Sequence, residues 1–153
     1  MKVTALEEYG LRCMIMLARN GLHESLTLPQ LAKNEGLSIP YAGKLLALLR
    51  KGGLVSAARG RNGGYILAKP AEMITIKEIF EVLGEGIYST KHCAKFTGEA
   101  AVCVHKDDCN VRSIWQSFDN FFGAFLEKFT LWDVVSGKIN VFVPETPKSK
   151  ARL

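Results

Sequence analysis

The stretch LTLPQLAKNEGLSIPYAGKLLALLRKGGLVSAARGRNGGYILAK, Leu26–Lys69, decides the fold. Thr27 and, three residues later, Gln30 form a capping box that starts a helix, and Gly36 ends it. Ser38 supplies the N-cap of a second helix after a very short link. Two helices joined so closely are typical of a helix-turn-helix.

The second helix has one apolar face and is followed by a hairpin signal. Its apolar residues recur at helical spacing: Ala42, Leu45, Leu46 and Leu49. Beyond it, the β-prone runs LVSAA and YILA flank RGRNGG, a glycine-rich turn with an Asn-Gly step. Helix, turn, helix and hairpin, in this order, indicate a winged helix-turn-helix.

The flanking segments are predicted to be helices. LEEYGLRCMIMLARNG is apolar nearly all round, which predicts a central helix ending at Gly21, whereas ITIKEIFEVLGEG and TLWD each begin with a Thr-x-x-acid capping pattern. VRSIWQSFDNFFGAFLEKF predicts a long helix with an apolar stripe of Ile114, Phe118, Phe121, Phe122, Phe125 and Phe129. This stripe exceeds what a small domain buries, so part of it is expected to pack on a second subunit. The expected fold is therefore mainly α, with a winged helix-turn-helix DNA-binding domain plus a long dimerisation helix.

Charge is distributed unevenly along the chain. The net charge is +5, and the segment 33–69 holds seven basic residues against one acid, whereas 72–108 holds seven acids against four lysines. A basic face confined to one part indicates that this part contacts a nucleic acid or a membrane.

The position of the basic and polar residues favours DNA. The first turns of a helix held in a helix-turn-helix reach base edges in the major groove, and a glycine-rich hairpin tip brings arginine close to the DNA backbone or minor groove. The candidate DNA contacts are Thr27, Ser38, Pro40, Tyr41, Lys44, Arg59, Arg61 and Asn62.

Three of the four cysteines lie in one polar segment. Nine residues separate Cys93 from Cys103 and five separate Cys103 from Cys109, which differs from the paired spacing of zinc ribbons. Thiolates favour iron–sulfur clusters, zinc or copper(I), and His92, His105 or a residue from elsewhere would complete a set of four ligands. Redox switching of the thiols without metal is the alternative.

The other signals limit compartment and class. No secretory signal is visible, and the apolar run CMIMLA is too short to span a membrane, so a cytoplasmic protein is expected. Cys13 lies in an apolar helical context and is expected to be a buried hydrophobe. With no Cys-x-x-Cys and no phosphate-cradling loop, an enzyme is not expected, and a small redox or electron-transfer protein is the weakest alternative.

These segments together resemble the IscR/NsrR family of bacterial iron–sulfur-sensing transcription regulators. The resemblance runs from about Lys2 to Gly137 and rests on TALEEYGLRCMIMLA, the winged-helix stretch, ITIKEIFEVL, the three loop cysteines and the helix before TLWDVV. It implies a homodimer with crossed long helices and a [2Fe-2S] or [4Fe-4S] cluster near the dimer interface.

The resemblance also implies a ligand set. Cys93, Cys103 and Cys109 would be the sulfur ligands. Some members use a histidine just after the last cysteine, but CNVRSIW offers none. Others use an acidic residue in the first helix of the opposite subunit, and the matching position is Glu8, with Glu7 as its adjacent rival.

The sequence therefore predicts four parts: 1–83, a winged helix-turn-helix domain; 84–109, a cysteine-bearing cluster loop; 110–137, the dimerisation helix and a short following helix; and 138–153, a disordered basic tail. The expected function is that of a homodimeric, sequence-specific DNA-binding transcription regulator controlled by an iron–sulfur cluster that senses redox state, nitric oxide or iron–sulfur status. A metal-free cysteine thiol-switch regulator is the alternative.

Overall fold

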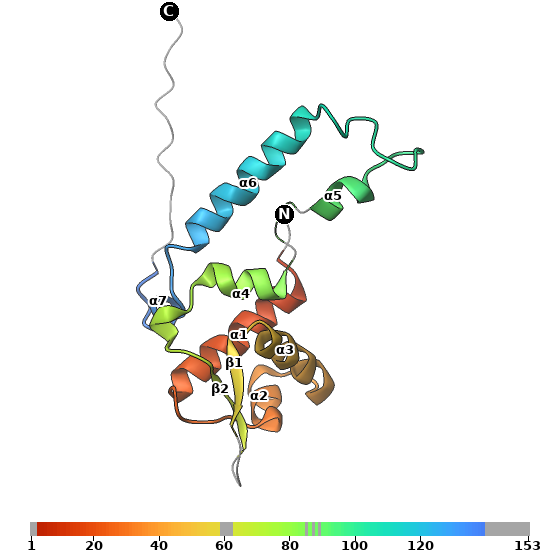
Figure 1. Cartoon of the computed structure of the whole chain (residues 1–153). Helices are drawn as coiled ribbons and strands as arrows, with labels where there is room; N and C mark the ends of the chain where they lie inside the picture. The colour runs from red at the N-terminus through yellow and green to blue at the C-terminus, as the bar shows by residue number, and fades with distance from the viewer. Residues whose placement is uncertain (1–2, 59–62, 85, 87, 89, 140–153) are drawn as a thin grey trace, which may run out of the picture.

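The computed structural model describes residues 3–58, 63–84, 86, 88 and 90–139 (Figure 1). Its elements are α1 Ala5–Asn20, α2 Leu28–Glu35, α3 Ile39–Lys51, β1 Val55–Ala58, β2 Gly64–Leu67, the 3-10 helix η1 Ala71–Met73, α4 Ile76–Leu83, α5 Thr90–Lys95, α6 Asn110–Leu126 and α7 Leu131–Val135. The predicted fold class, mainly α with a winged helix-turn-helix, is confirmed.

Helix starts follow the predicted capping boxes. Thr27 caps α2 with Gln30, Thr75 caps α4, and Thr130 caps α7, each with reciprocal hydrogen bonds to the residue three positions on. Gly36 ends α2 in the left-handed conformation, at φ 67°, which glycine adopts without strain.

The core forms where α1 crosses α3 and α4. Cys13, Met14 and Leu17 of α1 are fully buried, which confirms the prediction of a central helix. The α3 stripe is buried in full, as predicted: Ala42, Leu45, Leu46 and Leu49. Gly10 lets α1 approach α4 closely, since a Cβ there would clash with the Leu83 side chain.

The hairpin is antiparallel and is joined to the helix-turn-helix. Val55 pairs with Leu67 and Ala58 with Gly64. The predicted hairpin is therefore confirmed. Tyr65 exchanges both backbone hydrogen bonds with Leu26, at 2.8 and 3.0 Å, just before the cap of α2. Gly64 permits this approach, because a Cβ would lie 2.5 Å from the Leu26 carbonyl oxygen.

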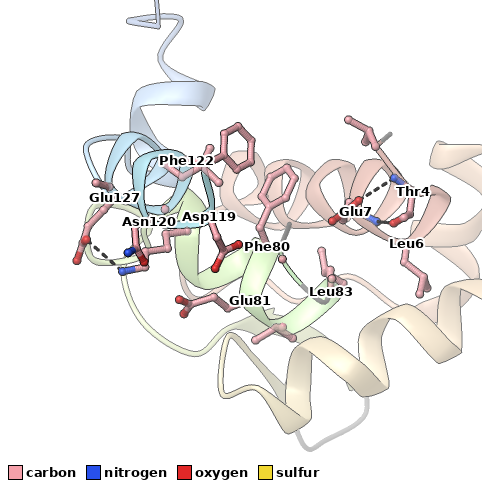
Figure 2. A pocket seen from close by; sticks show the side chains of 18 of the residues that line it. Thr4, Leu6, Glu7, Phe80, Glu81, Leu83, Asp119, Asn120, Phe122 and Glu127 are labelled. Atoms are coloured by element: carbon pink, nitrogen blue, oxygen red, sulfur yellow. Dashed lines mark hydrogen bonds and ion pairs between the residues drawn. The ribbon is translucent and has the colours of Figure 1, made fainter. Parts of the chain in front are cut away.

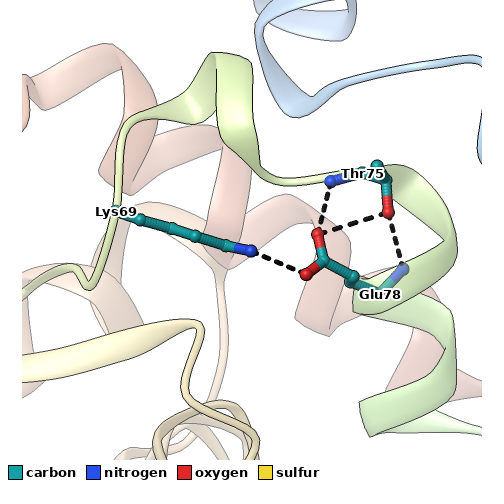
Figure 3. Close-up of polar contacts among 3 residues, drawn as sticks. All are labelled: Lys69, Thr75 and Glu78. Carbon is teal, nitrogen blue, oxygen red and sulfur yellow. Dashed lines mark hydrogen bonds and ion pairs between the residues drawn. The ribbon is translucent and has the colours of Figure 1, made fainter.

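Two contacts fix the segments next to α4. One joins the residue after the hairpin to α4, and the other places α7 beside α1. Lys69 Nζ lies 2.6 Å from Glu78 Oε1, while Glu78 Oε2 accepts a hydrogen bond from the Thr75 backbone at 2.8 Å (Figure 3). Thr75 pairs with Thr130, and Leu131 of α7 is fully buried in the core beside α1. The short helix after α6 thus returns to the N-terminal body.

The long helix α6 projects from this body, with α5 and the cysteine segment at its far end (Figure 1). None of its 17 residues is fully buried. In the described part of the chain, no helix is long and apolar enough to cross a membrane.

Candidate functional site

The exposed side of α3 is a basic and polar surface at its N-terminal half. Ser38 caps the helix, its Oγ accepting from the Tyr41 backbone at 3.4 Å. Pro40 and Lys44 are exposed, whereas Tyr41 is half-buried because its ring packs on Tyr9. This surface offers one cation and a hydroxyl to an external partner.

Thr27, at the start of α2, is committed to its own helix. Its hydroxyl donates to Gln30 Oε1 at 2.8 Å and accepts from the Gln30 backbone at 3.4 Å. A DNA contact by Thr27 stays a prediction, and one made by its hydroxyl would compete with the cap. The predicted wing-tip contacts Arg59, Arg61 and Asn62 lie outside the described residues.

The three loop cysteines stand on different parts of one segment. Cys93 lies on α5, Cys103 in the loop, and Cys109 at the N-cap position of α6. All three are free thiols and half-buried. Within the described residues, no group of three Cys, His, Asp or Glu side chains is close enough to hold a metal ion.

Cys109 is the N-cap residue of the long helix α6. It precedes a 17-residue helix, and no side-chain hydrogen bond caps that helix. The first-turn N–H groups and the helix dipole favour negative charge there. Arg112, in the same turn, adds a cation and closes the loop by donating from Nη2 to the Lys106 carbonyl at 2.6 Å.

Tyr88 joins this group, although sequence reasoning did not single it out. Its hydroxyl lies 3.6 Å from Cys93 Sγ, and its backbone N–H donates to Asp119 Oδ1 on α6 at 3.3 Å. The hydrogen bond with Cys93 raises the pKa of Tyr88, and partial burial adds to the rise, whereas the nearby Arg112 charge opposes it. A tyrosine five residues before a cysteine carries no recognised spacing signal, so only the fold reveals the contact.

The two glutamates at the start of α1 differ in their roles. Glu7 Oε2 accepts from the Thr4 backbone at 2.7 Å, and Thr4 Oγ1 accepts from the Glu7 backbone at 3.2 Å. This capping box was readable as Thr-x-x-Glu but was not predicted. Glu8 is exposed and, among the described residues, makes no side-chain hydrogen bond or ion pair.

The two histidines considered as metal ligands are His92 and His105. His105 is exposed in the loop, and no metal-holding group includes it in the described part of the chain. The side chain of His92 lies outside the described residues.

Cys13 is separate from this segment. It is fully buried on α1, and burial raises the pKa of its thiol to about 11, with the Glu35 charge adding to the rise. This agrees with the prediction of a structural cysteine.

A groove of about 1040 Å³ lies between the start of α1, α4 and α6. Phe80 of α4 and Phe122 of α6 stand in it, with Glu7 across from them and Asp119 on the α6 side (Figure 2). Two other aromatic residues of α6, which do not line the groove, are also exposed: Phe118 is 50% and Phe121 70% exposed. An apolar surface of this kind marks an interaction site.

The sequence of this chain is similar to those of known transcriptional regulators. The family model Rrf2, described as an iron-dependent transcriptional regulator, matches residues 3–137. The HTH-type transcriptional regulator IscR of Escherichia coli O1:K1 / APEC is 30% identical over 138 residues, covering 90% of this chain and 82% of the relative.

Two solved structures are similar to this chain over nearly all of its length. The structure of T. potens IscR superposes with a TM-score of 0.69 at 29% identity, covering 95% of this chain and 94% of that one. The structure of CymR (YrzC), described as the global cysteine regulator of B. subtilis, also gives a TM-score of 0.69, at 30% identity, covering 90% of this chain and 98% of that one.

Proposed function

The chain belongs to the Rrf2 family of DNA-binding transcriptional regulators, and on this premise we propose that it acts as a homodimer whose affinity for its operator is set by an iron–sulfur cluster. The observation that carries the proposal is the set of three free cysteines in the segment that leads into the long, exposed helix α6.

DNA reading falls to α3 and the wing. The proposed contacts to base edges and phosphates come from the first turns of α3, where Ser38, Pro40, Tyr41 and Lys44 lie, and from Thr27 at the start of α2. Arg59, Arg61 and Asn62 would reach the DNA from the wing tip. Because Tyr65 and Leu26 tie the wing to α2 by two backbone hydrogen bonds, the wing and the helix-turn-helix would meet DNA as one unit.

Dimerisation would use the exposed face of α6. A helix with no fully buried residue gains little from tertiary packing, and packing supplies most of the stability of helices in proteins. A second copy's α6, packed along the exposed face of this helix, would cover Phe118 and Phe121. The proposed division of the chain follows: 1–83 reads DNA, 84–109 senses, 110–137 dimerises, with α7 anchoring the long helix to the first part.

The residues present fit a cluster by their donor chemistry. Three thiols can supply the thiolates that iron–sulfur clusters require, and Cys109 stands at the N-terminus of α6. The buried Nε of Arg112 has no hydrogen-bond acceptor among the described residues. An anionic centre beside the start of α6 is the kind of acceptor this donor needs. We propose Cys93, Cys103 and Cys109 as the sulfur ligands of a [2Fe-2S] or [4Fe-4S] cluster.

Glu8 of the opposite subunit is the proposed fourth ligand. Its exposed carboxylate is available, whereas that of Glu7 is used in the capping box of α1. When bound, the cluster would supply an iron centre reactive toward oxidants and nitric oxide. Glu8 would then connect α1 of one subunit to the cysteine segment of the other.

This connection would reach the DNA-reading helix through α1. Tyr9 follows Glu8 directly and packs on Tyr41 of α3. Arg12, one turn on, binds Glu35 of α2 at 2.7 Å. A change at Glu8 would therefore act on both helices of the helix-turn-helix and on the spacing of the two α3 helices, which must match half-sites on DNA.

The alternative is a metal-free thiol switch. Three free thiols and the similarity to the global cysteine regulator of B. subtilis support it. In this case, Cys93 would form a disulfide with Cys103 or Cys109 upon oxidation.

One experiment separates the two functions. Protein purified without oxygen is examined by absorption spectroscopy with iron and acid-labile sulfide analysis. The proposal expects visible absorbance that Cys103→Ala abolishes, with Lys44→Ala weakening operator binding at unchanged iron content. A colourless, iron-free protein with a reversible thiol titre would support the switch instead.

A further inference from the structure

A tyrosine just before the first loop cysteine contacts that cysteine. Tyr88 lies between α4 and α5, and its hydroxyl is 3.6 Å from Cys93 Sγ, within hydrogen-bond reach for sulfur. Either atom can be the donor when both are protonated. Once Cys93 is a thiolate, only the tyrosine hydroxyl can donate.

The backbone of Tyr88 is fixed from the opposite side. Its N–H donates to Asp119 Oδ1 in the middle of α6. Gly86 approaches the same oxygen, since a Cβ there would lie 2.9 Å from it, and its φ of 72° suits glycine. Asp119 therefore holds this segment against α6, and Tyr88 presents its hydroxyl from a supported position.

The hydroxyl also lies within electrostatic range of the other end of the loop. The charges of Cys109 and Arg112, both at the start of α6, act on it. Arg112 in turn closes the loop through the Lys106 carbonyl. One hydroxyl thus connects the first loop cysteine with the surroundings of the last.

A hydrogen-bond donor beside a ligand sulfur changes how strongly that sulfur binds a metal. Hydrogen bonds from neighbouring groups orient a metal's ligands and adjust their electron density, and losing one such partner typically lowers metal affinity by about 10- to 100-fold. A hydrogen bond to a cluster sulfur also changes the reduction potential. Removing a donor leaves more negative charge on the sulfur and so disfavours reduction.

We propose that Tyr88 is a positioning residue of the cysteine site, whose hydroxyl donates a hydrogen bond to the Cys93 sulfur and orients that sulfur toward a bound metal centre. The inference rests on the proposed function for the metal, but the hydrogen bond itself does not depend on it.

The test compares Tyr88→Phe, which removes only the hydroxyl, with Tyr65→Phe in the wing as the matched control. Cobalt(II) is titrated into metal-free, reduced full-length chain under anaerobic conditions, and the sulfur-to-cobalt charge-transfer absorbance is followed. We expect the apparent affinity of Tyr88→Phe to fall about tenfold and that of Tyr65→Phe to match the wild type. In protein loaded with iron and sulfide, Tyr88→Phe should also lower the reduction potential.

The outcomes distinguish this inference from the proposed function. If the wild type binds cobalt or a cluster and Tyr88→Phe behaves identically, the role of Tyr88 is wrong and cluster control stands. If the wild type binds neither, cluster control fails, and Tyr88 is judged by site-resolved alkylation of the metal-free chain. There, loss of the hydrogen bond in Tyr88→Phe should change the rate of Cys93 labelling relative to Cys103 by about fivefold; an unchanged ratio overturns the inference.

Discussion

The ring of Tyr9 on α1 meets the ring of Tyr41 on α3 edge-on, with centroids 6.1 Å apart and planes at 90°. Tyr9 also carries the Arg12 guanidinium over its face, at 5.4 Å. The residue next to the proposed ligand Glu8 thus contacts the start of α3, the proposed DNA-reading helix, directly.

Replacing Tyr9 should weaken the coupling between the cysteine site and DNA. An edge-on aromatic pair contributes about 1 kcal/mol, so Tyr9→Leu should reduce the ratio of operator affinities with and without cluster by about fivefold. Tyr9→Phe keeps the ring contact and should retain the ratio. Fluorescence anisotropy with labelled operator, at equal iron content, measures both; an unchanged ratio in Tyr9→Leu would exclude this route.

Mutations of the neighbouring residues Glu7 and Glu8 should have different effects. Glu8→Ala should alter the visible spectrum of anaerobic protein with little change in stability, because Glu8 is exposed and makes no side-chain bond among the described residues. Glu7→Ala should leave the spectrum intact and lower the free energy of unfolding by about 1 kcal/mol, as loss of a cap does. The opposite pattern would make Glu7 the ligand.

The Lys69–Glu78 contact should make stability depend on acid pH. The hydrogen bond from Lys69 holds the pKa of Glu78 below its usual value of 4.5, and the Thr75 backbone adds to this. A lowered carboxyl pKa stabilises the fold above the unfolded value, and this contribution is lost as pH falls through the folded value.

Glu78→Gln tests this contact because it keeps the capping box but removes the charge. We expect a loss of at most about 1 kcal/mol at pH 7, since the pair is partly exposed, and a shallower decline of stability below about pH 4.5. Urea unfolding at several pH values measures both. Identical pH profiles for the two proteins would contradict the assignment.

Cys13 should be inert in the folded chain. Its thiol is fully buried and has a pKa of about 11, so only about one molecule in a thousand carries its thiolate at pH 8. Brief alkylation of metal-free native protein should label Cys93, Cys103 and Cys109 but not Cys13, as peptide mass spectrometry would show. Labelling in denaturant provides the control in which all four react.

A charge on the exposed face of α6 should break the proposed dimer. Phe121 is 70% exposed in the single chain, so Phe121→Glu should leave the fold of the subunit intact while halving the mass measured by light scattering. Met73, 64% exposed on η1, provides the matched control, because Met73→Glu lies away from α6. A dimer that persists in Phe121→Glu would place the interface elsewhere.

Most of the helices and the hairpin could be predicted from local sequence rules. The caps at Thr27, Thr75 and Thr130, the buried α3 stripe and the hairpin were all readable, because each depends on residues within a few positions of one another. The box of Thr4 and Glu7 obeys the same rule and was missed. The short helix α5 within the cysteine segment was also not predicted, since that polar stretch has no apolar period.

The sequence by itself determined the elements, their order and the donor types in the loop: hydrogen bonds within a helix turn and period-matched burial are encoded locally. Only the tertiary structure decided that α7 returns to bury Leu131 beside α1, that Tyr9 packs on Tyr41, and that Tyr88 meets Cys93. These relations depend on how separate segments pack together, because a side chain finds such a partner only after the chain between them has been folded into place.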